Sequence, residues 1–471
     1  MIELCRRQMS FAEGLIAEAV DELWEQWMRE VDEVLADAQL LAIVYEALAQ
    51  RWPKSRTRGR KGTPAEVVLR LLLLKHIRNW SYAVLEREVR ANLVYRQFTR
   101  VGAEKVPDAK TLGKLGIALG PQIIEQIHQR VVAIAQEKKI VAGRRMRVDT
   151  TVVETNIHYP TDSTLLGDGV RVLTRTMKAI ARLAGAAGTK LRDRTRAVKF
   201  RLLEIGRASR SRGEEAKEKL KHVYRKLLST TGRVVAQARR FAHEVSSGIK
   251  CAAWPLGQVL LEARRQSLET MIPRVRQVMR QARERIFKGN TRVAGKLVSL
   301  FEPHTEVIRK GKAAKPTEFG KMVKIQEAER QIVIDYEVYE ERPSDSALLI
   351  PALEAHEQQL GRAPRLVTAD AAFFSSSNEA AAHARGVKRI AIPNRSTKSA
   401  ERKKLQKKRW FRNAQKWRTG SEGRISLLKR RHGLNRCRYK GQCGMKRWVG
   451  LGVIGDNLIN IGRTLAASAK T

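Results

Sequence analysis

Hydrophobic positions follow a helical period over the first 140 residues and again between residues 165 and 300. Within residues 11–50 the apolar side chains that recur at helical spacing are Leu15, Val20, Leu23, Trp24, Trp27, Val31 and Val34. This pattern predicts an acidic amphipathic helix. On periodicity alone it is a packing helix, and the alternative is a dimerisation or regulatory arm that competes with nucleic acid for a basic groove.

A basic linker, residues 51–62, leads into three short predicted helices. The first has Thr63 as its expected N-cap, then proline, then Glu66 in the capping-box position. The second covers residues 81–96, beginning at a serine cap, and the third covers residues 109–119. Three helices with tight breaks resemble a helix-turn-helix module, although helical trios also occur as plain packing units. The basic linker beside them favours the first interpretation.

Beyond residue 140, runs of β-branched and other apolar residues alternate with helical patterns. The predicted strands are residues 148–156, 321–325, 331–339, 365–369 and 388–393. This alternation favours an α/β core. Residues 395–410 are predicted to be a basic linker, and residues 448–465 an apolar helix.

Residues 165–300 separate the first two predicted strands and keep a helical period rich in cations. Glycine and serine breaks near residues 184–188, 208–213 and 247–248 divide the segment into several helices. We therefore predict an all-helical basic insertion within the α/β core.

The charge of the chain points to its partner. The chain has 471 residues, a formal net charge of +44 and a sequence pI near 10.8. Residues 171–300 hold 32 Lys and Arg against 9 Asp and Glu, whereas residues 11–48 hold ten acids and one base. Such a field favours a polyanion, and nucleic acid is the commonest one. No run of about 18 apolar residues is present, so we expect no membrane span.

Three acidic residues stand where an α/β core can bring them together. Asp149 interrupts a strand-like run, Asp370 ends another, and Glu422 lies in a predicted helix. At about 100° per residue, Arg418 and Lys429 share one helical face with Glu422. Each acid alone is more simply a capping, turn or ion-pair residue. Together they suggest a two-metal site for phosphoryl transfer, because carboxylate oxygens suit Mg²⁺.

At these residues the chain resembles the DDE transposases of bacterial insertion sequences. The family's Tyr-x2-Arg-x3-Glu-x6-Lys signature is similar to the segment that holds Arg418, Glu422 and Lys429. Gln415 occupies the tyrosine position, and Trp417 is close by. The match at this helix is the most specific part of the resemblance.

The two aspartates extend the resemblance. Asp149 in Val-Asp-Thr-Thr matches the family's first aspartate, and Asp370 in Thr-Ala-Asp matches its second. Residues 60–119 look like the amino-terminal helical domain of these enzymes. The resemblance covers about residues 60–160 and 320–465, and the helical segment between them has no residue-by-residue match.

The resemblance implies a ribonuclease-H-like α/β catalytic core, interrupted by the all-helical insertion and preceded by a helix-turn-helix-like DNA-binding domain. It implies that Asp149 bridges two Mg²⁺ ions, with Mn²⁺ as a substitute, while Asp370 and Glu422 each hold one. The enzyme would bind the terminal inverted repeats of its element, hydrolyse a phosphodiester and transfer the freed 3′-hydroxyl into target DNA. No small-molecule cofactor is implied.

The expected partner is double-stranded DNA, both element ends and target, bound by a homodimer or higher oligomer because two ends must be joined. Candidate DNA contacts are Arg418, Lys429, Arg87, Arg90, Lys110, Lys114, Arg171, Arg175 and Lys178, and Trp417 is a candidate for stacking on an unpaired base. We expect the protein in the bacterial cytoplasm, near the nucleoid. Four cysteines in a chain of this length fit a reducing compartment.

The chain is therefore divided into five predicted parts. They are an acidic helical arm (1–50), an N-terminal helical DNA-binding domain (51–140), the catalytic core (141–164 and 301–440), the basic helical insertion (165–300) and a C-terminal helix (441–471). Two other functions stay open at this point. One is a non-catalytic architectural or regulatory DNA-binding protein, and the other is a ribonuclease-H-like nuclease without joining activity.

Overall fold

The structure is a computed structural model that describes residues 1–5, 20, 22–51, 53–211, 213–309 and 316–468. The chain forms two compact units, each with its own hydrophobic core. Unit 1 joins residues 1–156 with residues 310–471, and unit 2 consists of residues 157–309. Among the helices of the described residues, none has the length and apolar character needed to cross a membrane.

Unit 1 begins with a group of helices. They are α2 (Gln26–Leu35), α3 (Ala38–Arg51), η1 (Pro53–Arg56), α4 (Ala65–Ile77), α5 (Tyr82–Ala91), α6 (Leu93–Phe98), α7 (Ala109–Ala118) and α8 (Pro121–Glu137). The single helix predicted over residues 11–50 is interrupted at Asp37, whose carboxylate accepts a hydrogen bond from the Leu40 N–H and starts α3. Leu15, also part of that prediction, lies outside the described residues.

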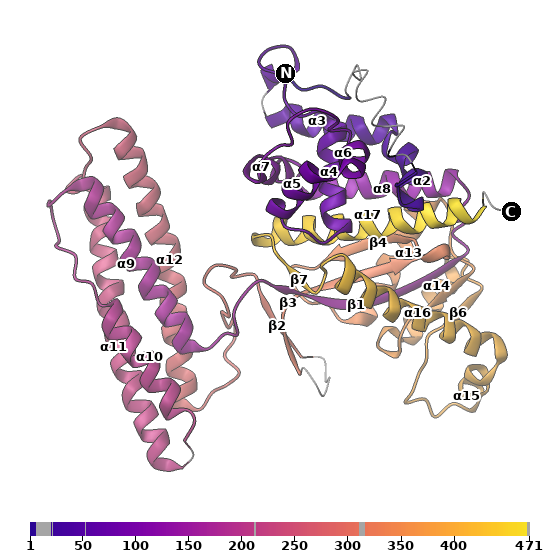
Figure 1. Ribbon diagram of the computed structural model, residues 1–471. Coiled ribbons are helices and arrows are strands. Elements are labelled where there is room, and N and C mark those ends of the chain that lie inside the picture. The colour runs from indigo at the N-terminus through magenta and orange to yellow at the C-terminus, as the bar shows by residue number, and fades with distance from the viewer. Residues whose placement is uncertain (6–19, 21, 52, 212, 310–315, 469–471) are drawn as a thin grey trace. The chain divides into compact units, whose positions relative to one another are not determined.

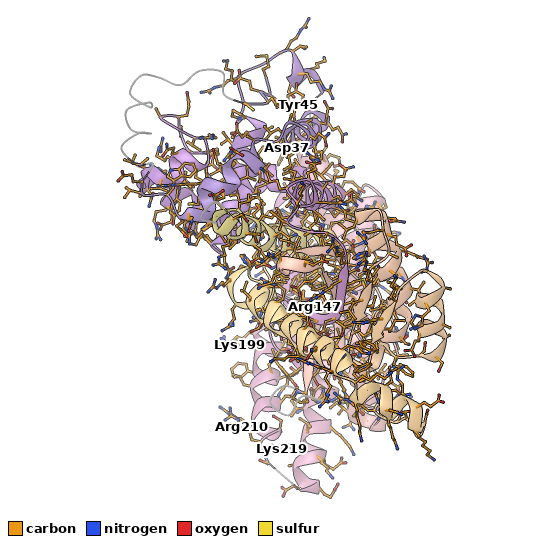
Figure 2. All side chains as sticks on the ribbon, turned by 90° about the vertical axis from the view of Figure 1, so that its right-hand side faces the viewer. Asp37, Tyr45, Arg147, Lys199, Arg210 and Lys219 are labelled. Atoms are coloured by element: carbon orange, nitrogen blue, oxygen red, sulfur yellow. The ribbon has the colours of Figure 1, made fainter. Side chains whose placement is uncertain are left out.

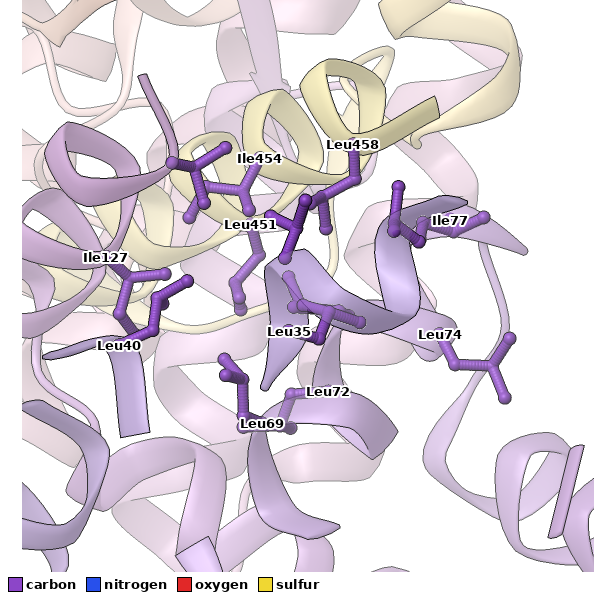
Figure 3. Close-up of a cluster of buried hydrophobic side chains, with 14 of the residues drawn as sticks. Leu35, Leu40, Leu69, Leu72, Leu74, Ile77, Ile127, Leu451, Ile454 and Leu458 are labelled. Carbon is purple, nitrogen blue, oxygen red and sulfur yellow. The ribbon is translucent and has the colours of Figure 1, made fainter. Parts of the chain in front are cut away.

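These helices and the C-terminal helix α17 (Gly441–Ser468) share one core, which Figure 3 shows. Its buried side chains include Leu35, Leu40, Leu69, Leu72, Ile127, Leu451, Ile454 and Leu458. Helix α2, which lies within the predicted arm of residues 1–50, packs within this core. One of its acids, Asp32, lies 2.6 Å from the buried guanidinium of Arg70, which Glu66 also contacts at 2.9 Å.

The predicted helix bounds agree with α4 and α7, the helix predicted over residues 81–96 is divided at Asn92 into α5 and α6, and one predicted cap is wrong. The N-cap of α4 is Pro64 and not Thr63, and it makes no side-chain capping bond. The Glu66 carboxylate contacts the Arg70 guanidinium instead and does not complete a capping box. The serine cap of α5 is confirmed, since the Ser81 hydroxyl accepts the Val84 N–H.

Unit 1 also holds a mixed sheet. Its strands are β1 (Arg145–Thr155), β3 (Thr317–Glu327), β4 (Val333–Val338), β5 (Leu366–Thr368), β6 (Arg389–Ala391) and β7 (Arg436–Cys437). They lie in the order β4-β3-β1-β5-β6, with β7 beside the end of β1. β1 pairs antiparallel with β3 and parallel with β5. All five predicted strands are therefore present.

Between these strands lie η2 (Glu329–Gln331), η3 (Asp345–Leu348), α13 (Leu349–Leu360), η4 (Ala371–Phe373), α14 (Ser376–Ala384), α15 (Ala400–Lys407) and α16 (Arg409–Arg431). The predicted linker over residues 395–410 is wrong, because α15 forms there, with the Ser399 hydroxyl accepting the Arg402 N–H at its start. Figure 1 shows α17 between the N-terminal helices and the sheet. Its Trp448 and Val453 belong to a second core with sheet residues such as Val323.

Unit 2 consists mainly of α9 (Asp162–Ala184), α10 (Thr195–Ala208), α11 (Glu214–Ser246) and α12 (Pro255–Lys288), with β2 (Glu306–Arg309) at its end. Figure 1 shows the four helices side by side. Their core is apolar and includes the buried side chains of Leu173, Phe241 and Val275. The glycine and serine breaks predicted from the sequence fall between these helices.

Candidate active site

The first two predicted acids follow neighbouring strands. Asp149 lies within β1, and Asp370 comes two residues after the end of β5. The two strands run parallel, with Arg147 opposite Thr368. The paired register ends at Arg147 and Thr368, and extending it by two residues along each segment leads to Asp149 and Asp370. Paired strands lie ~4.8 Å apart.

The Asp149 carboxylate is nearly enclosed, with 15% of its side chain exposed. Burial raises its pKa above the ordinary value of 3.8, and the charge of Asp370 adds to the rise. Three donors act in the opposite direction: the Thr150 N–H at 2.7 Å, the Ser421 hydroxyl at 3.2 Å and the Arg418 guanidinium at 3.9 Å. The two aspartates therefore repel each other at a place where a cation is favourable.

Helix α16 brings the third acid to this place. Glu422 lines a cavity of about 1100 Å³ that Asp149 also lines. Arg418, one turn earlier, lies 3.1 Å from Glu422 and 3.9 Å from Asp149. Lys429 lines the same cavity, as the helical spacing predicts. The Glu422 side chain remains 65% exposed, so most of its surface faces solvent.

Asp370 does not line this cavity. Its carboxylate accepts the Ala372 N–H at 2.8 Å and starts the short helix η4. Across the described parts of the chain, no three His, Cys, Asp or Glu side chains lie close enough to hold one metal ion. The structure thus brings Asp149 near each of the other two acids, but it does not close all three into one ligand cage.

A buried chain of four charges lies behind the acids, and sequence reasoning missed it. Arg147 of β1 donates two hydrogen bonds of 2.8 Å to Glu327 of β3. Glu327 lies 3.4 Å from Nε of Arg424 on α16, which donates at 2.9 Å to both carboxylate oxygens of Asp456 on α17. Each side chain is 5% exposed or less. Burial raises the pKa of Glu327, and the two arginines oppose the rise.

This buried charge chain holds α16 against the sheet and so positions Glu422. Arg147 also donates at 2.6 Å to the backbone oxygen of Trp417, and its guanidinium lies 4.9 Å from the centre of the Trp417 ring. Figure 2 shows Arg147 on β1 beside α16. Gly420 permits this approach, because a Cβ there would lie 2.3 Å from Nη1 of Arg147. One face of the Trp417 ring, a predicted base-stacking surface, is thus occupied within the fold.

Gln415, in the tyrosine position of the signature, also connects α16 to the sheet. Its side-chain nitrogen donates at 3.1 Å to the Thr368 hydroxyl, and it donates to the backbone oxygen of Ala391. Arg147 has a sequence signal, because it lies between the apolar Met146 and Val148, whereas Glu327 follows Gln326 beyond the strand predicted over residues 321–325. That signal names charged positions within strands, but it does not say which side chain neutralises which.

The predicted DNA contacts outside the cavity differ in their surroundings. Arg87 and Arg90 are exposed and pair with Glu88 and Glu86, respectively. Arg171 and Lys178 pair with Asp168 and Asp193 at 2.6 Å. Lys110, Lys114 and Arg175 are exposed. The cavity itself contains three further cations that the sequence analysis did not select, which are Arg430, Arg436 and Arg438.

Two family models match parts of the chain. Residues 21–115 match a transposase domain (DUF772), and residues 378–461 match a transposase DDE domain. Both matched domains are transposase domains, and together they support a DDE transposase. A search of curated proteins and a search of solved structures each found no match to it.

The transposase is therefore an enzyme that acts on DNA, of a class that cleaves and transfers DNA with divalent metal ions. Its first matched range runs from the end of the undescribed N-terminal segment through most of α7. The second runs from α14 into α17 and includes Glu422. Asp149 and Asp370 lie outside both ranges, so their assignment depends on the geometry described above.

Proposed function

We propose that this transposase binds the terminal inverted repeats of its element, hydrolyses a phosphodiester at each end in a Mg²⁺-dependent reaction, and transfers the freed 3′-hydroxyl into target DNA. One observation carries the proposal. Asp149 meets two acids from distant segments, Asp370 across a parallel strand pair and Glu422 across a cavity. Carboxylates gathered in this way are the ligands that paired divalent cations use in phosphoryl transfer.

The surroundings of these acids fit a divalent cation. The pKa of Asp149 is raised by burial and by the neighbouring Asp370, so ionising both is unfavourable without added positive charge. Arg418 provides part of that charge from 3.9 Å. Asp149, Asp370 and Glu422 would hold two Mg²⁺ ions, for which Mn²⁺ can substitute. The bound metal would polarise a phosphate oxygen and lower the pKa of a water.

The remaining groups orient the acids and the DNA. Ser421 fixes one oxygen of Asp149 through its hydroxyl. Arg418 presents a planar fork and Lys429 a point charge to phosphates beside the cut. In the first step a P–O bond to water forms and the bond to the 3′-oxygen breaks. In the second step that 3′-oxygen bonds to a target phosphorus and displaces the target's own 3′-oxygen, so the number of phosphodiester bonds is conserved.

The other parts of the chain would supply DNA recognition and assembly. The N-terminal helices act as a helix-turn-helix-like domain for the inverted repeat, with Arg87, Arg90, Lys110 and Lys114 at its exposed surface. The sheet of unit 1 is the ribonuclease-H-like core, and unit 2 is the basic insertion within it. Because two element ends must be joined in one event, the transposase works as a homodimer or larger assembly on DNA.

The test uses isosteric removal of each charge. Asp149→Asn, Asp370→Asn and Glu422→Gln are each expected to abolish Mg²⁺-dependent nicking and joining of a labelled element end, while end binding in a gel shift is unchanged. The matched control is Glu340→Gln, an exposed acid of unit 1 that lies outside the cavity and pairs with Lys446.

Two results would contradict the proposal. A purified variant that still joins ends would remove that acid from the catalytic set. Wild-type protein that nicks the end but never joins a 3′-hydroxyl to plasmid DNA would indicate a nuclease without transfer activity.

A further inference from the structure

The two halves of helix α12 in unit 2 differ in charge. In α12, residues 255–272 carry two acidic and two basic residues. Residues 274–288 of the same helix carry six basic residues and one acidic residue. A solvated helix gains nothing from such segregation, because like charges one turn apart repel. The second half of α12 is therefore a candidate binding surface.

A groove lies beside this half, between α11 and α12. It has a volume of about 640 Å³ and is lined by Gly232, Val235, Ala236, Arg239, Pro273, Arg276, Gln277, Met279, Arg280 and Arg283. The hollow exists because α11 presents small residues at Gly232 and Ala236, which leave space above the buried Val235 and Met279. Its floor is therefore apolar and its polar groups are almost all arginines.

The four arginines of the groove lack ion-pair partners. Among the described residues, no carboxylate lies within 4.0 Å of the side-chain nitrogens of Arg239, Arg276, Arg280 or Arg283. Three other cations of α12 are paired: Arg265 with Glu262 and Glu269, Arg285 with Asp162, and Lys288 with Glu284. Four arginines without an ion pair thus line the hollow, and these paired cations lie outside it.

We propose that this groove binds the sugar-phosphate backbone of duplex DNA. Three of its arginines, Arg276, Arg280 and Arg283, follow one face of α12 at intervals of about 6 and 4.5 Å of helix rise, and Arg239 faces them from α11. Each guanidinium offers a planar fork that suits a phosphate. The inference rests on the proposed action on DNA and specifies which surface of unit 2 carries it.

The groove contacts DNA without reading its sequence. Its one amide side chain, Gln277, donates to the backbone oxygen of Gly295 and is thereby held to the segment after α12. Arginine contacts to phosphate carry no sequence information. The assignment also revises the sequence-based choice of Arg171 and Lys178 as the contacts of this unit, because both are already paired with aspartates.

The experiment measures DNA binding as a function of salt. Fluorescence anisotropy of an arbitrary duplex of about 30 base pairs, without divalent metal, gives the slope of log K against log salt. The full-length variant carries Arg239→Gln, Arg276→Gln, Arg280→Gln and Arg283→Gln. Its slope is expected to be smaller by about 3 to 4 than that of the wild type. Between about 50 and about 200 mM salt the wild type then loses roughly 150-fold more affinity than the variant.

The matched control removes the same amount of charge from the same unit. It carries Arg171→Gln, Lys178→Gln, Arg201→Gln and Lys217→Gln, four cations that each contact a carboxylate within 2.6 Å. Its slope should stay close to the wild-type value. A second variant with lysine at the four groove positions keeps the charge and should also retain the slope, which excludes loss of folding as the cause.

Three results would overturn the inference. The groove variant keeps the wild-type slope, the control flattens the slope as much as the groove variant does, or the groove variant binds DNA more tightly. The last result would mean that an acidic segment of another copy, and not DNA, occupies the groove. Failure of the proposed catalysis is distinguishable, because it would appear in nicking and joining while these slopes stay as predicted.

Discussion

The two sides of helix α16 differ in how their charged side chains are buried and paired. On the inner side, Arg424 lies between Glu327 and Asp456, and all three side chains are 3% exposed or less. On the cavity side, Arg418 lies between Asp149 and Glu422 at 3.9 and 3.1 Å, with Glu422 65% exposed. The inner charges are neutralised within the fold. The outer acids share Arg418 and lie at an open cavity, so another cation can reach them.

This difference separates a structural use of charge from a catalytic one. A buried ion pair contributes little net stability, but losing one partner is costly because the other stays buried and unpaired. An exposed pair contributes little in either case. The buried charge chain therefore fixes where α16 lies, and the cavity side remains available for metal and DNA. Both statements can be tested by substitutions that differ in one charge.

The largest expected effect is on the inner side. Asp456→Ala leaves Arg424 buried without its bidentate partner and is expected to lower the free energy of unfolding by about 3 to 5 kcal/mol. Urea unfolding followed by tryptophan fluorescence would measure it, since seven of the eight tryptophans lie in unit 1. Glu340→Ala, at an exposed pair with Lys446, is the control and should change stability by less than about 0.5 kcal/mol. Equal effects of the two substitutions would mean that the buried and the exposed ion pair contribute equally to stability.

A buried lysine of α4 tests whether a buried charge needs a carboxylate partner. Nζ of Lys75 is surrounded by the rings of Tyr82, Tyr439 and Trp448, with ring centres 4.8–5.0 Å away. Burial lowers its pKa from 10.5 to about 7, and Arg438 adds to the shift. Between these two pH values the unfolded chain holds the proton and the folded chain does not, so folding releases it and stability rises with pH.

Lys75→Met removes this dependence. The variant should gain most relative to the wild type below pH about 7, and the gain should shrink as the pH rises toward 10.5. Thermal unfolding across this range measures the difference. Lys61→Met, in the exposed basic linker, should show no such trend. A constant difference for Lys75→Met would mean that the rings stabilise the ammonium as well as water does.

The sequence predicted the elements of this fold well, because most have a strong local period or a clear cap. The strands around Asp149 and Asp370 were predicted close to their observed bounds, and a helix was predicted around Glu422. The predictions that failed concern tertiary contacts. Glu66 does not cap its helix because Arg70 binds it, and one predicted linker forms helix α15, whose Arg402 pairs with Glu379.

The candidate site was predicted only in part, for a related reason. Helical spacing is enough to put Arg418, Glu422 and Lys429 on one face of α16, and they do line or border one cavity. The pairing of Arg147 with Glu327 needs the register of β1 and β3, which joins residues 180 positions apart. No local pattern contains that register, so the groups that position α16 could not be identified from the sequence.

A smaller effect is expected at Asp149 on the cavity side. Its raised pKa means that the folded protein holds the proton more tightly than the unfolded chain does. The wild type should therefore lose stability relative to Asp149→Asn as the pH rises above the ordinary value of 3.8, and the two should converge below it. Added Mg²⁺ should stabilise the wild type alone and reduce the difference at neutral pH. A wild type that is more stable than the variant at neutral pH without metal would show that the outer charges are already satisfied.

The smallest effect on stability is expected at Glu422, which faces the cavity from the helical turn that also holds Arg424. Glu422→Gln removes one exposed pair with Arg418 and should change the free energy of unfolding by less than about 0.5 kcal/mol. Arg424→Gln, on the inner side of the same turn, leaves Asp456 buried without its arginine and Glu327 with Arg147 as its remaining arginine partner, and it should cost several times more. Urea unfolding of the two variants side by side compares the faces of α16 directly. Similar losses would mean that Glu422 is held by the fold as firmly as the buried charge chain, and that it is not free to turn toward a metal.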